Sequence, residues 1–165
     1  MTTVLNRDSI KVKRDLQKRV ENWVAEYCDA LEENFKQYSI RSYKMNIDKP
    51  TEVSKGYTSY YEEQLQKIED GTANLYKFVF KTGKKFHKVY FLQYEEANEY
   101  YNRKAGYKAG SVHCFIDKKT GEVYKAASWK APAKIVRFDL RLIGDREFLF
   151  NPNNISWAGS HLYLR

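Results

Sequence analysis

The first long pattern in the chain is a stripe of apolar residues at helical spacing. They recur every three or four positions among charged residues, at Leu16, Val20, Trp23, Val24, Tyr27, Leu31 and Phe35. Asp8 or Ser9 can cap the first turn, and no Gly or Pro interrupts the stripe. The pattern predicts one amphipathic helix over residues 9–37, after a flexible lead at residues 1–8. A sheet in the same domain would cover the apolar stripe, with a partner helix in a dimer as the alternative.

Alternating patterns further along the chain predict two β-hairpins. Residues 75–94 and 112–126 each alternate around a turn that contains Gly, at Gly83 and Gly121. In the second hairpin, Gly121 can take the positive φ that closes the loop. Asp117 can accept hydrogen bonds from the amides of the same turn.

The remaining patterns are shorter. Three of them predict strands, at residues 40–47, 136–142 and 155–165. Residues 60–68 and 94–103 each predict a short helix, and residues 145–148 predict a turn or a short helix. In the second of these, Ala97, Tyr100 and Tyr101 fall on the inward side.

Together these elements predict a single α+β domain over residues 1–165. A long N-terminal amphipathic helix would pack on a mainly antiparallel sheet built from two hairpins and C-terminal strands. Residues 74–142 would form a basic, β-rich core, and residues 155–165 would add a closing strand.

Charged residues are unevenly distributed along the chain, and this distribution bears on the partner that the protein binds. The formal net charge is +8. Residues 74–138 hold 14 basic and 5 acidic residues, whereas residues 1–73 hold 12 and 13, and residues 139–165 hold 3 of each. A basic block of this kind attracts anions and favours nucleic acid or an acidic protein as partner. The alternative is a solvated basic face that only aids solubility.

Cysteine use and hydropathy bear on the setting. Cys28 and Cys114 lie far apart, one in a helical pattern and one in a strand pattern, which favours buried thiols over a disulfide. No apolar run approaches the length of a membrane span, so no membrane partner is expected. Residues 1–20 are too charged for a signal peptide. These features favour a reducing, intracellular compartment.

Metal ligands are few. His113 and Cys114 are neighbours in a strand, so their side chains should diverge, while His87 and His161 are expected to lack a close second ligand. No metal site and no cofactor are therefore predicted.

One set of three charged residues resembles a nuclease site. Asp117, Glu122 and Lys125 recur in the acid, acid and lysine order that holds a divalent cation against phosphate. Glu122 and Lys125 are three apart in a strand and so face opposite ways. A turn with a cross-strand ion pair explains the same residues. No catalytic residue is predicted, and the chain is interpreted as a non-enzyme.

What remains is a set of lysines interleaved with aromatic residues. The candidate phosphate contacts are Lys77, Lys81, Lys84, Lys85, Lys88, Lys118, Lys119 and Lys125. Rings at Tyr76, Phe78, Phe86 and Tyr90 would stack on bases. The alternative is a core role for Tyr76, Phe78 and Phe80, which share one face of a strand.

The segment from Gly106 to Lys134, with the terminal SWAGSHLYLR, resembles segments of small uncharacterised proteins of tailed bacteriophages. The resemblance covers about the last third of the chain and leaves out the N-terminal helix. It implies a phage origin, with the host bacterial cytoplasm or the virion as the setting. It supplies no catalytic residues.

The sequence thus predicts a small non-enzymatic protein that binds nucleic acid through a basic, aromatic, β-rich surface with little sequence specificity. The alternative is a protein-binding module, either a virion component or a modulator of a host factor, that docks through the long helix or a sheet edge. A hydrolase with an unrecognised site is the third possibility.

Overall fold

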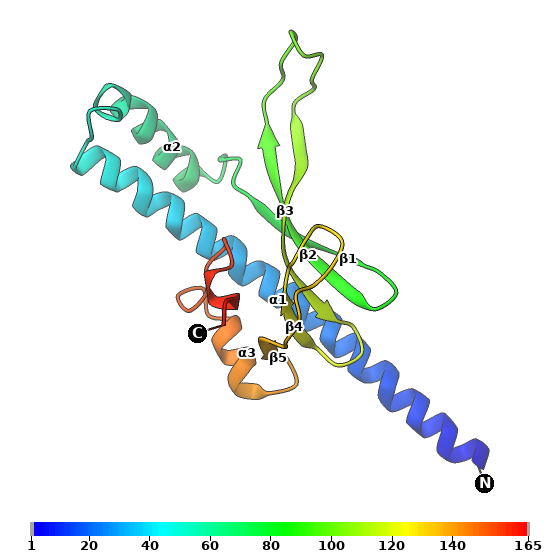
Figure 1. Cartoon of the computed structure of the whole chain (residues 1–165). Coiled ribbons are helices and arrows are strands. Elements are labelled where there is room, and N and C mark those ends of the chain that lie inside the picture. The colour runs from blue at the N-terminus through cyan, green and yellow to red at the C-terminus, as the bar shows by residue number, and fades with distance from the viewer. Residues whose placement is uncertain (1, 165) are drawn as a thin grey trace.

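The computed structural model describes residues 2–164, with side chains from residue 8 onward. A 47-residue helix, α1 (Thr2–Asp48), runs the length of the molecule, and a five-stranded antiparallel sheet packs on its middle (Figure 1). The strands, in chain order and in sheet order, are β1 (Lys77–Thr82), β2 (Phe86–Glu95), β3 (Gly106–Asp117), β4 (Glu122–Lys125) and β5 (Phe138–Asp139). The smaller helices are η1 (Lys55–Tyr57), α2 (Thr58–Asp70), α3 (Ile143–Leu149) and η2 (Ser160–Leu162). The α+β class is confirmed, as are the short helix predicted at residues 60–68 and the turn or short helix predicted at residues 145–148.

α1 begins earlier than predicted. Residues 2–8, predicted as a flexible lead before the helix, belong to the helix, and residue 1 lies outside the described residues. Nothing in this segment breaks a helix, since the first Pro is Pro50 and the first Gly comes after it. The N-terminal end of α1 therefore projects beyond the sheet (Figure 1). No helix within residues 2–164 is long and apolar enough to cross a membrane.

α1 also ends later than predicted, so residues 40–47 are helical and the predicted strand is wrong. The apolar positions there also fit helical spacing, and α2 covers them as the second helix of an antiparallel pair (Figure 1). The rings of Tyr43 and Tyr61 lie 6.0 Å apart in this contact. The helix stops at Asp48 because Pro50 disfavours helical backbone at the residue before it.

Both predicted hairpins are present. β1 and β2 are joined through a turn at Gly83, and β3 and β4 pair across residues 118–121. Gly121 has φ +80°, as its place in the turn requires. Asp117 Oδ1 accepts hydrogen bonds from the backbone N–H groups of Lys119 at 2.8 Å and Thr120 at 3.1 Å. The predicted roles of Gly121 and Asp117 are confirmed.

β2 and β3 also pair with each other, so the helix predicted at residues 94–103 is wrong. The two strands leave the sheet as a long arm (Figure 1), and two backbone hydrogen bonds of 2.8 Å between Asn98 and Arg103 close its tip. Tyr100 and Tyr101, predicted to face inward, are 88% and 67% exposed. The polar residues of this segment recur at a spacing that is typical of an exposed helix surface, but here they lie at the solvent-exposed tip of a hairpin.

The C-terminal segment departs most from its predicted strands. Of residues 136–142, only the two residues of β5 pair with β4, and residues 155–164 contain the helix η2 in place of the predicted closing strand. Ile135 takes φ +74°, which turns the chain immediately before β5. The Arg137 guanidinium then donates to the carbonyl of Leu162 at 2.6 Å. The pairing with β4 is therefore limited to β5.

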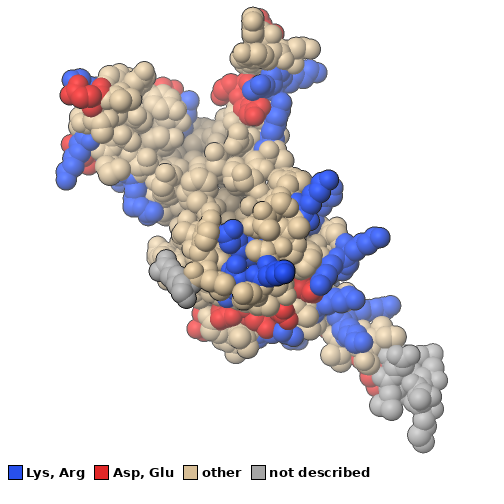
Figure 2. All heavy atoms as spheres, viewed as in Figure 1, with Lys and Arg blue, Asp and Glu red and all other residues tan. Residues whose placement is uncertain are grey.

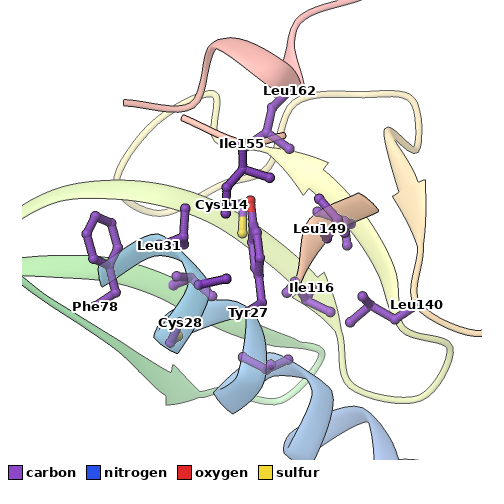
Figure 3. Packing of buried hydrophobic residues seen from close by; sticks show 14 of the residues in the cluster. Tyr27, Cys28, Leu31, Phe78, Cys114, Ile116, Leu140, Leu149, Ile155 and Leu162 are labelled. Carbon is purple, nitrogen blue, oxygen red and sulfur yellow. The ribbon is translucent and has the colours of Figure 1, made fainter. Parts of the chain in front are cut away.

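The core lies between α1 and the inner face of the sheet (Figure 3). Its largest fully buried side chains are Tyr27, Leu31, Ile116, Leu140, Leu149 and Leu162. Trp23, in the middle of the predicted stripe, is only half-buried, and the Arg146 guanidinium lies 4.4 Å from its ring. Cys28 and Cys114 are buried free thiols, as predicted. Burial raises the pKa of the Cys28 thiol to about 12, so it stays protonated and unreactive.

Asn34 fastens the C-terminal loop to α1. Its Nδ2 donates to the carbonyls of Pro152 at 2.9 Å and Ile155 at 2.8 Å, and its Oδ1 accepts from the Trp157 N–H at 2.7 Å. Asn34 lies two helical turns beyond Tyr27, so both face the same loop. The buried amide is thereby fully satisfied, and the loop supplies α1 with its polar partners.

Candidate nucleic-acid interface

The face of the sheet that is turned away from α1 carries basic and aromatic residues from both hairpins. Side chains alternate along β2, so Val89 is fully buried in the core while Lys88 points to the outer face. The strand register places Lys81 of β1 and Phe115 of β3 on either side of Lys88. The two hairpins therefore contribute to one surface.

Five lysines line a hollow of about 260 Å³ at the β1–β2 turn, here named the lysine hollow. They are Lys81, Lys84, Lys85, Lys88 and Lys130. Phe86 and Phe115 supply its apolar lining, with ring centroids 5.8 Å apart. Among the side chains that the structure describes, no acidic residue lines the hollow. Figure 2 shows Lys and Arg side chains gathered over the β1–β2 turn and the adjoining part of α1.

Lys81 and Lys88 lie directly opposite each other across β1 and β2. Like charges in this position repel and destabilise a sheet. Among residues 8–164, none of the five lysines of the hollow forms a salt bridge. No carboxylate among the described residues thus offsets the repulsion, and a bound polyanion would relieve it.

Aromatic rings hold two of these amines in place. Lys88 Nζ lies 4.8 Å from the Trp129 ring centroid and 5.8 Å from that of Phe115, and Lys85 Nζ lies 5.3 Å from that of Phe86. Cation–π contacts of this kind restrain long side chains. Trp129 is 45% exposed, so a ring is available beside the lysines for stacking on a base.

Lys130 is absent from the predicted contacts. It reaches the lysine hollow because the segment after β4 folds back on itself, with Ala127 N–H donating to the Ala131 carbonyl at 3.0 Å and Ala133 N–H to the Lys125 carbonyl at 2.7 Å. The sequence signal for this return is weak. The signal is Trp129, a large ring in a connection of otherwise small and polar residues, which indicates that this connection packs on another part of the protein.

Two predicted lysines lie away from the hollow. Lys77 lines a different pocket with Glu32, and its Nζ is 4.3 Å from the Tyr107 ring centroid. Lys125 donates to a neighbouring backbone carbonyl at 3.2 Å and lies 4.6 Å from the Tyr163 ring centroid. The structure does not bring these two into the cluster.

The other two occupy the β3–β4 turn. Lys119 is exposed there, and its backbone N–H serves the Asp117 cap. Lys118 Nζ donates to the Gly83 carbonyl at 3.0 Å, on the side of the β1–β2 turn that faces α1. Of the eight predicted lysines, the structure gathers Lys81, Lys84, Lys85 and Lys88.

Three of the predicted aromatic residues belong to the core, as the alternative interpretation held. Tyr76 stacks between Phe35 and Phe91, with ring centroids 4.2 and 4.7 Å away. Phe78 is 3% exposed, and Phe80 packs beside the inner face. These rings are closed to bases, whereas Phe86 and Tyr90 lie on the outer face.

Three residues that are far apart in the sequence meet in the core. The Tyr27 hydroxyl lies 2.7 Å from His113 Nε2 and 2.6 Å from His161 Nε2. His113 Nδ1 faces the Trp157 carbonyl at 3.1 Å and so carries a proton, which makes its Nε2 the acceptor for the Tyr27 hydroxyl. His161 Nδ1 accepts from the Ser156 N–H at 3.1 Å, so its Nε2 donates to Tyr27. One neutral chain of hydrogen bonds results.

This network corrects the expectation that His161 lacks a neighbouring ligand, because the His113 and His161 rings lie 5.6 Å apart. All four ring nitrogens are nevertheless occupied. Burial lowers the pKa of His113 to about 3 and that of His161 to about 4, and it raises the pKa of Tyr27. Among the described residues, no three His, Cys, Asp or Glu groups are placed to hold a metal ion. The network acts as a structural tie between α1, β3 and η2.

The group that resembles a nuclease site is explained by the turn. Asp117 is engaged by the turn amides. Glu122 pairs with Arg141 at 3.3 Å and accepts from the Tyr124 hydroxyl at 2.8 Å. The turn interpretation is confirmed, but the partner of Glu122 is Arg141 and not Lys125.

Comparisons with known proteins place the chain in one family. No curated protein and no solved structure matches it. Residues 7–164 match the sequence pattern of DUF7717, a family of unknown function. Because this match spans nearly the whole chain, the protein belongs to the DUF7717 family.

Proposed function

We propose that the protein binds nucleic acid through the lysine hollow and the aromatic residues beside it. Phosphate contacts would supply most of the affinity, and sequence specificity would be low. The observation that carries the proposal is the cross-strand pair of Lys81 and Lys88, set among three further lysines with no carboxylate. Because a pair of like charges across two strands destabilises a sheet, its presence here favours a functional role for the two lysines.

The size of the lysine hollow suits a phosphate and its sugar better than a whole small molecule. Pockets that enclose drug-sized ligands measure about 300–1,000 Å³, and this hollow is smaller and open to solvent. Each lysine amine offers three N–H donors to phosphate oxygens. The lysine hollow is thus better suited to a nucleic-acid backbone that runs across it than to a small molecule enclosed within it.

The exposed Trp129 ring beside the hollow favours single strands. Trp129 and Tyr90 lie edge to face with centroids 5.7 Å apart, on the same surface as Lys88. Base stacking on an aromatic ring contributes about 1–3 kcal/mol and tolerates any base. A duplex offers phosphates but no free base faces, so single-stranded DNA or RNA should bind more tightly.

The experiment measures binding of labelled single strands and duplexes at several salt concentrations. For the wild-type protein, log affinity should fall with log salt by about 0.7 per contacted phosphate of a single strand. Lys84→Gln with Lys85→Gln should lower that slope by up to about 1.4. The matched control is Lys44→Gln with Lys49→Gln, the same charge change on exposed residues near the far end of α1, which should leave the slope unchanged.

Two results would overturn the proposal. One is a wild-type protein that retains no nucleic acid at about 50 mM salt, where phosphate contacts are little screened. The other is an equal loss of slope in the two double variants, because the binding would then reflect net charge and not the lysine hollow.

A protein-binding module is the second candidate, and one observation favours docking through α1. On the projecting end of this helix, Val12 is 68% and Ile10 41% exposed. The free edge of β1 suits docking less well, because Glu32 Oε1 accepts a hydrogen bond from the Phe78 N–H at 2.9 Å. The Lys84 and Lys85 double variant would leave such a partner bound. A phage setting, in the host cytoplasm or the virion, suits either function.

A further inference from the structure

The basic surface continues past the lysine hollow. On the other side of the β1–β2 turn, a second hollow of about 410 Å³ lies against α1 and is named here the helix-side hollow. Its charged and polar lining includes Arg14, Lys18 and Glu21 of α1 together with Thr82, His87 and Lys118. Three cations thus face one carboxylate, which leaves the hollow positive.

The two hollows are held in a fixed relation by the turns between them. Thr82 lines both. Lys118 Nζ donates to the Gly83 carbonyl at 3.0 Å, and the Lys118 backbone N–H donates to the Lys85 carbonyl at 3.0 Å. The β3–β4 turn is therefore tied to the β1–β2 turn, and the latter separates the two hollows as a narrow ridge.

His87 gives the helix-side hollow a second feature that points to a ligand. The residue is 3% exposed, and its Nδ1 pairs with the Thr82 hydroxyl at 2.8 Å. Among the described residues, its Nε2 has no hydrogen-bond partner. A buried polar atom without a partner costs about 1–3 kcal/mol. When the Thr82 hydroxyl donates to Nδ1, Nε2 carries a proton that has no acceptor among the described residues, and His87 lines the hollow.

We propose that the helix-side hollow is a second phosphate site, and that one nucleic-acid strand crosses the β1–β2 turn to occupy both hollows. This inference rests on the proposed function and adds the form of the ligand, a strand several nucleotides long. Two positive hollows that share Thr82 on either side of one turn can each hold a phosphate of the same polymer. A mononucleotide can fill only one of them.

The test compares labelled single strands of about 4 and about 16 nucleotides, the range of site sizes for single-strand grooves. A strand that fills both hollows gains from linked contacts, so the wild-type protein should bind the longer one at least about tenfold more tightly. Arg14→Gln with Lys18→Gln should remove most of this gain and leave the affinity for the shorter strand unchanged. Both residues are exposed, so the fold is retained.

The matched control is Arg41→Gln with Lys44→Gln, an equal change on exposed residues further along α1. It should bind both strands as the wild-type protein does. If the Arg14 and Lys18 variant keeps the full gain while the Lys84 and Lys85 variant binds weakly, the second site is refuted and the proposed function stands. If the wild-type protein binds neither strand, both proposals fail. An equal loss on short and long strands would also refute a strand that spans two hollows.

Discussion

Replacing Tyr27 with Phe removes one buried hydroxyl and keeps the ring. Tyr27 has no exposed surface, and its hydroxyl joins His113 Nε2 at 2.7 Å to His161 Nε2 at 2.6 Å. Phe fills nearly the same space, so no cavity opens and the packing around the ring is kept. The substitution therefore isolates the hydrogen bonds of the network.

The expected cost follows from the two groups that lose a partner. His113 Nε2 is left without a donor and His161 Nε2–H without an acceptor. Each unsatisfied buried group costs about 1–3 kcal/mol, which gives about 2–6 kcal/mol for the pair. His161 lines a surface pocket of about 530 Å³, so water can reach its ring more easily than that of His113. We therefore expect a loss of about 2–4 kcal/mol in the free energy of unfolding.

Urea unfolding followed by circular dichroism at neutral pH measures this loss directly. The matched control is Tyr107→Phe, which removes a hydroxyl that donates to the Leu75 carbonyl at 3.0 Å from a half-buried position. Water can replace that bond, so the control should cost about 1 kcal/mol or less. If Tyr27→Phe is no more costly than the control, the hydroxyl does not bridge the two imidazoles and the tautomer assignment is wrong.

Two further predictions concern stability. Because burial lowers the pKa of His113 to about 3 and of His161 to about 4, the unfolded chain binds protons below about pH 6.5 that the folded chain does not. Stability should thus be complete above that pH and fall below it by up to about 1.4 kcal/mol per pH unit for each histidine, and a flat profile between pH 7 and 5 in urea titrations would contradict this. Gly121→Val should cost about 1–3 kcal/mol, because it places a β-branched residue at φ +80° with its Cβ 3.2 Å from Leu140 Cβ. A wild-type melting temperature for that variant would show that the turn does not need Gly.

Features that depend on neighbours in the sequence could be predicted. The apolar stripe of α1 and the two hairpins follow from periodicity, and the roles of Gly121 and Asp117 follow from turn chemistry. The core role of Tyr76 and Phe78 follows from their shared face. In each case the physical cause lies within a few residues of the feature.

Features that depend on distant contacts could not be predicted. Residues 40–47 alternate weakly and also fit helical spacing, and the packing of α2 selects the helix. Residues 94–103 have a helix-like surface pattern, but the pairing of β2 with β3 makes them a hairpin tip. Tyr27 is 86 positions from His113 and 134 from His161, so no local pattern reports their meeting.

The same reasoning explains why only half of the predicted lysines cluster. Lys81, Lys84, Lys85 and Lys88 share one hairpin, so strand register alone brings them together. Lys130 joins them only because the chain folds back after β4, which composition does not reveal. Counting charge along a sequence therefore finds a basic surface but not its boundaries.

The buried network and the basic surface are linked through the rotation of α1. The fully buried stripe of Val20, Val24 and Leu31 fixes which side of the helix faces the sheet, and the hydrogen bonds of Tyr27 to His113 and His161 reinforce it. Arg14, Lys18 and Glu21 recur at helical spacing along a neighbouring side, so the same rotation turns them toward the β1–β2 turn. A helix rotated by one residue, about 100°, would carry Arg14 and Lys18 away from Lys118 and leave the lysine hollow intact. The packing that fixes the rotation of α1 thus also places the helix-side hollow beside the lysine hollow.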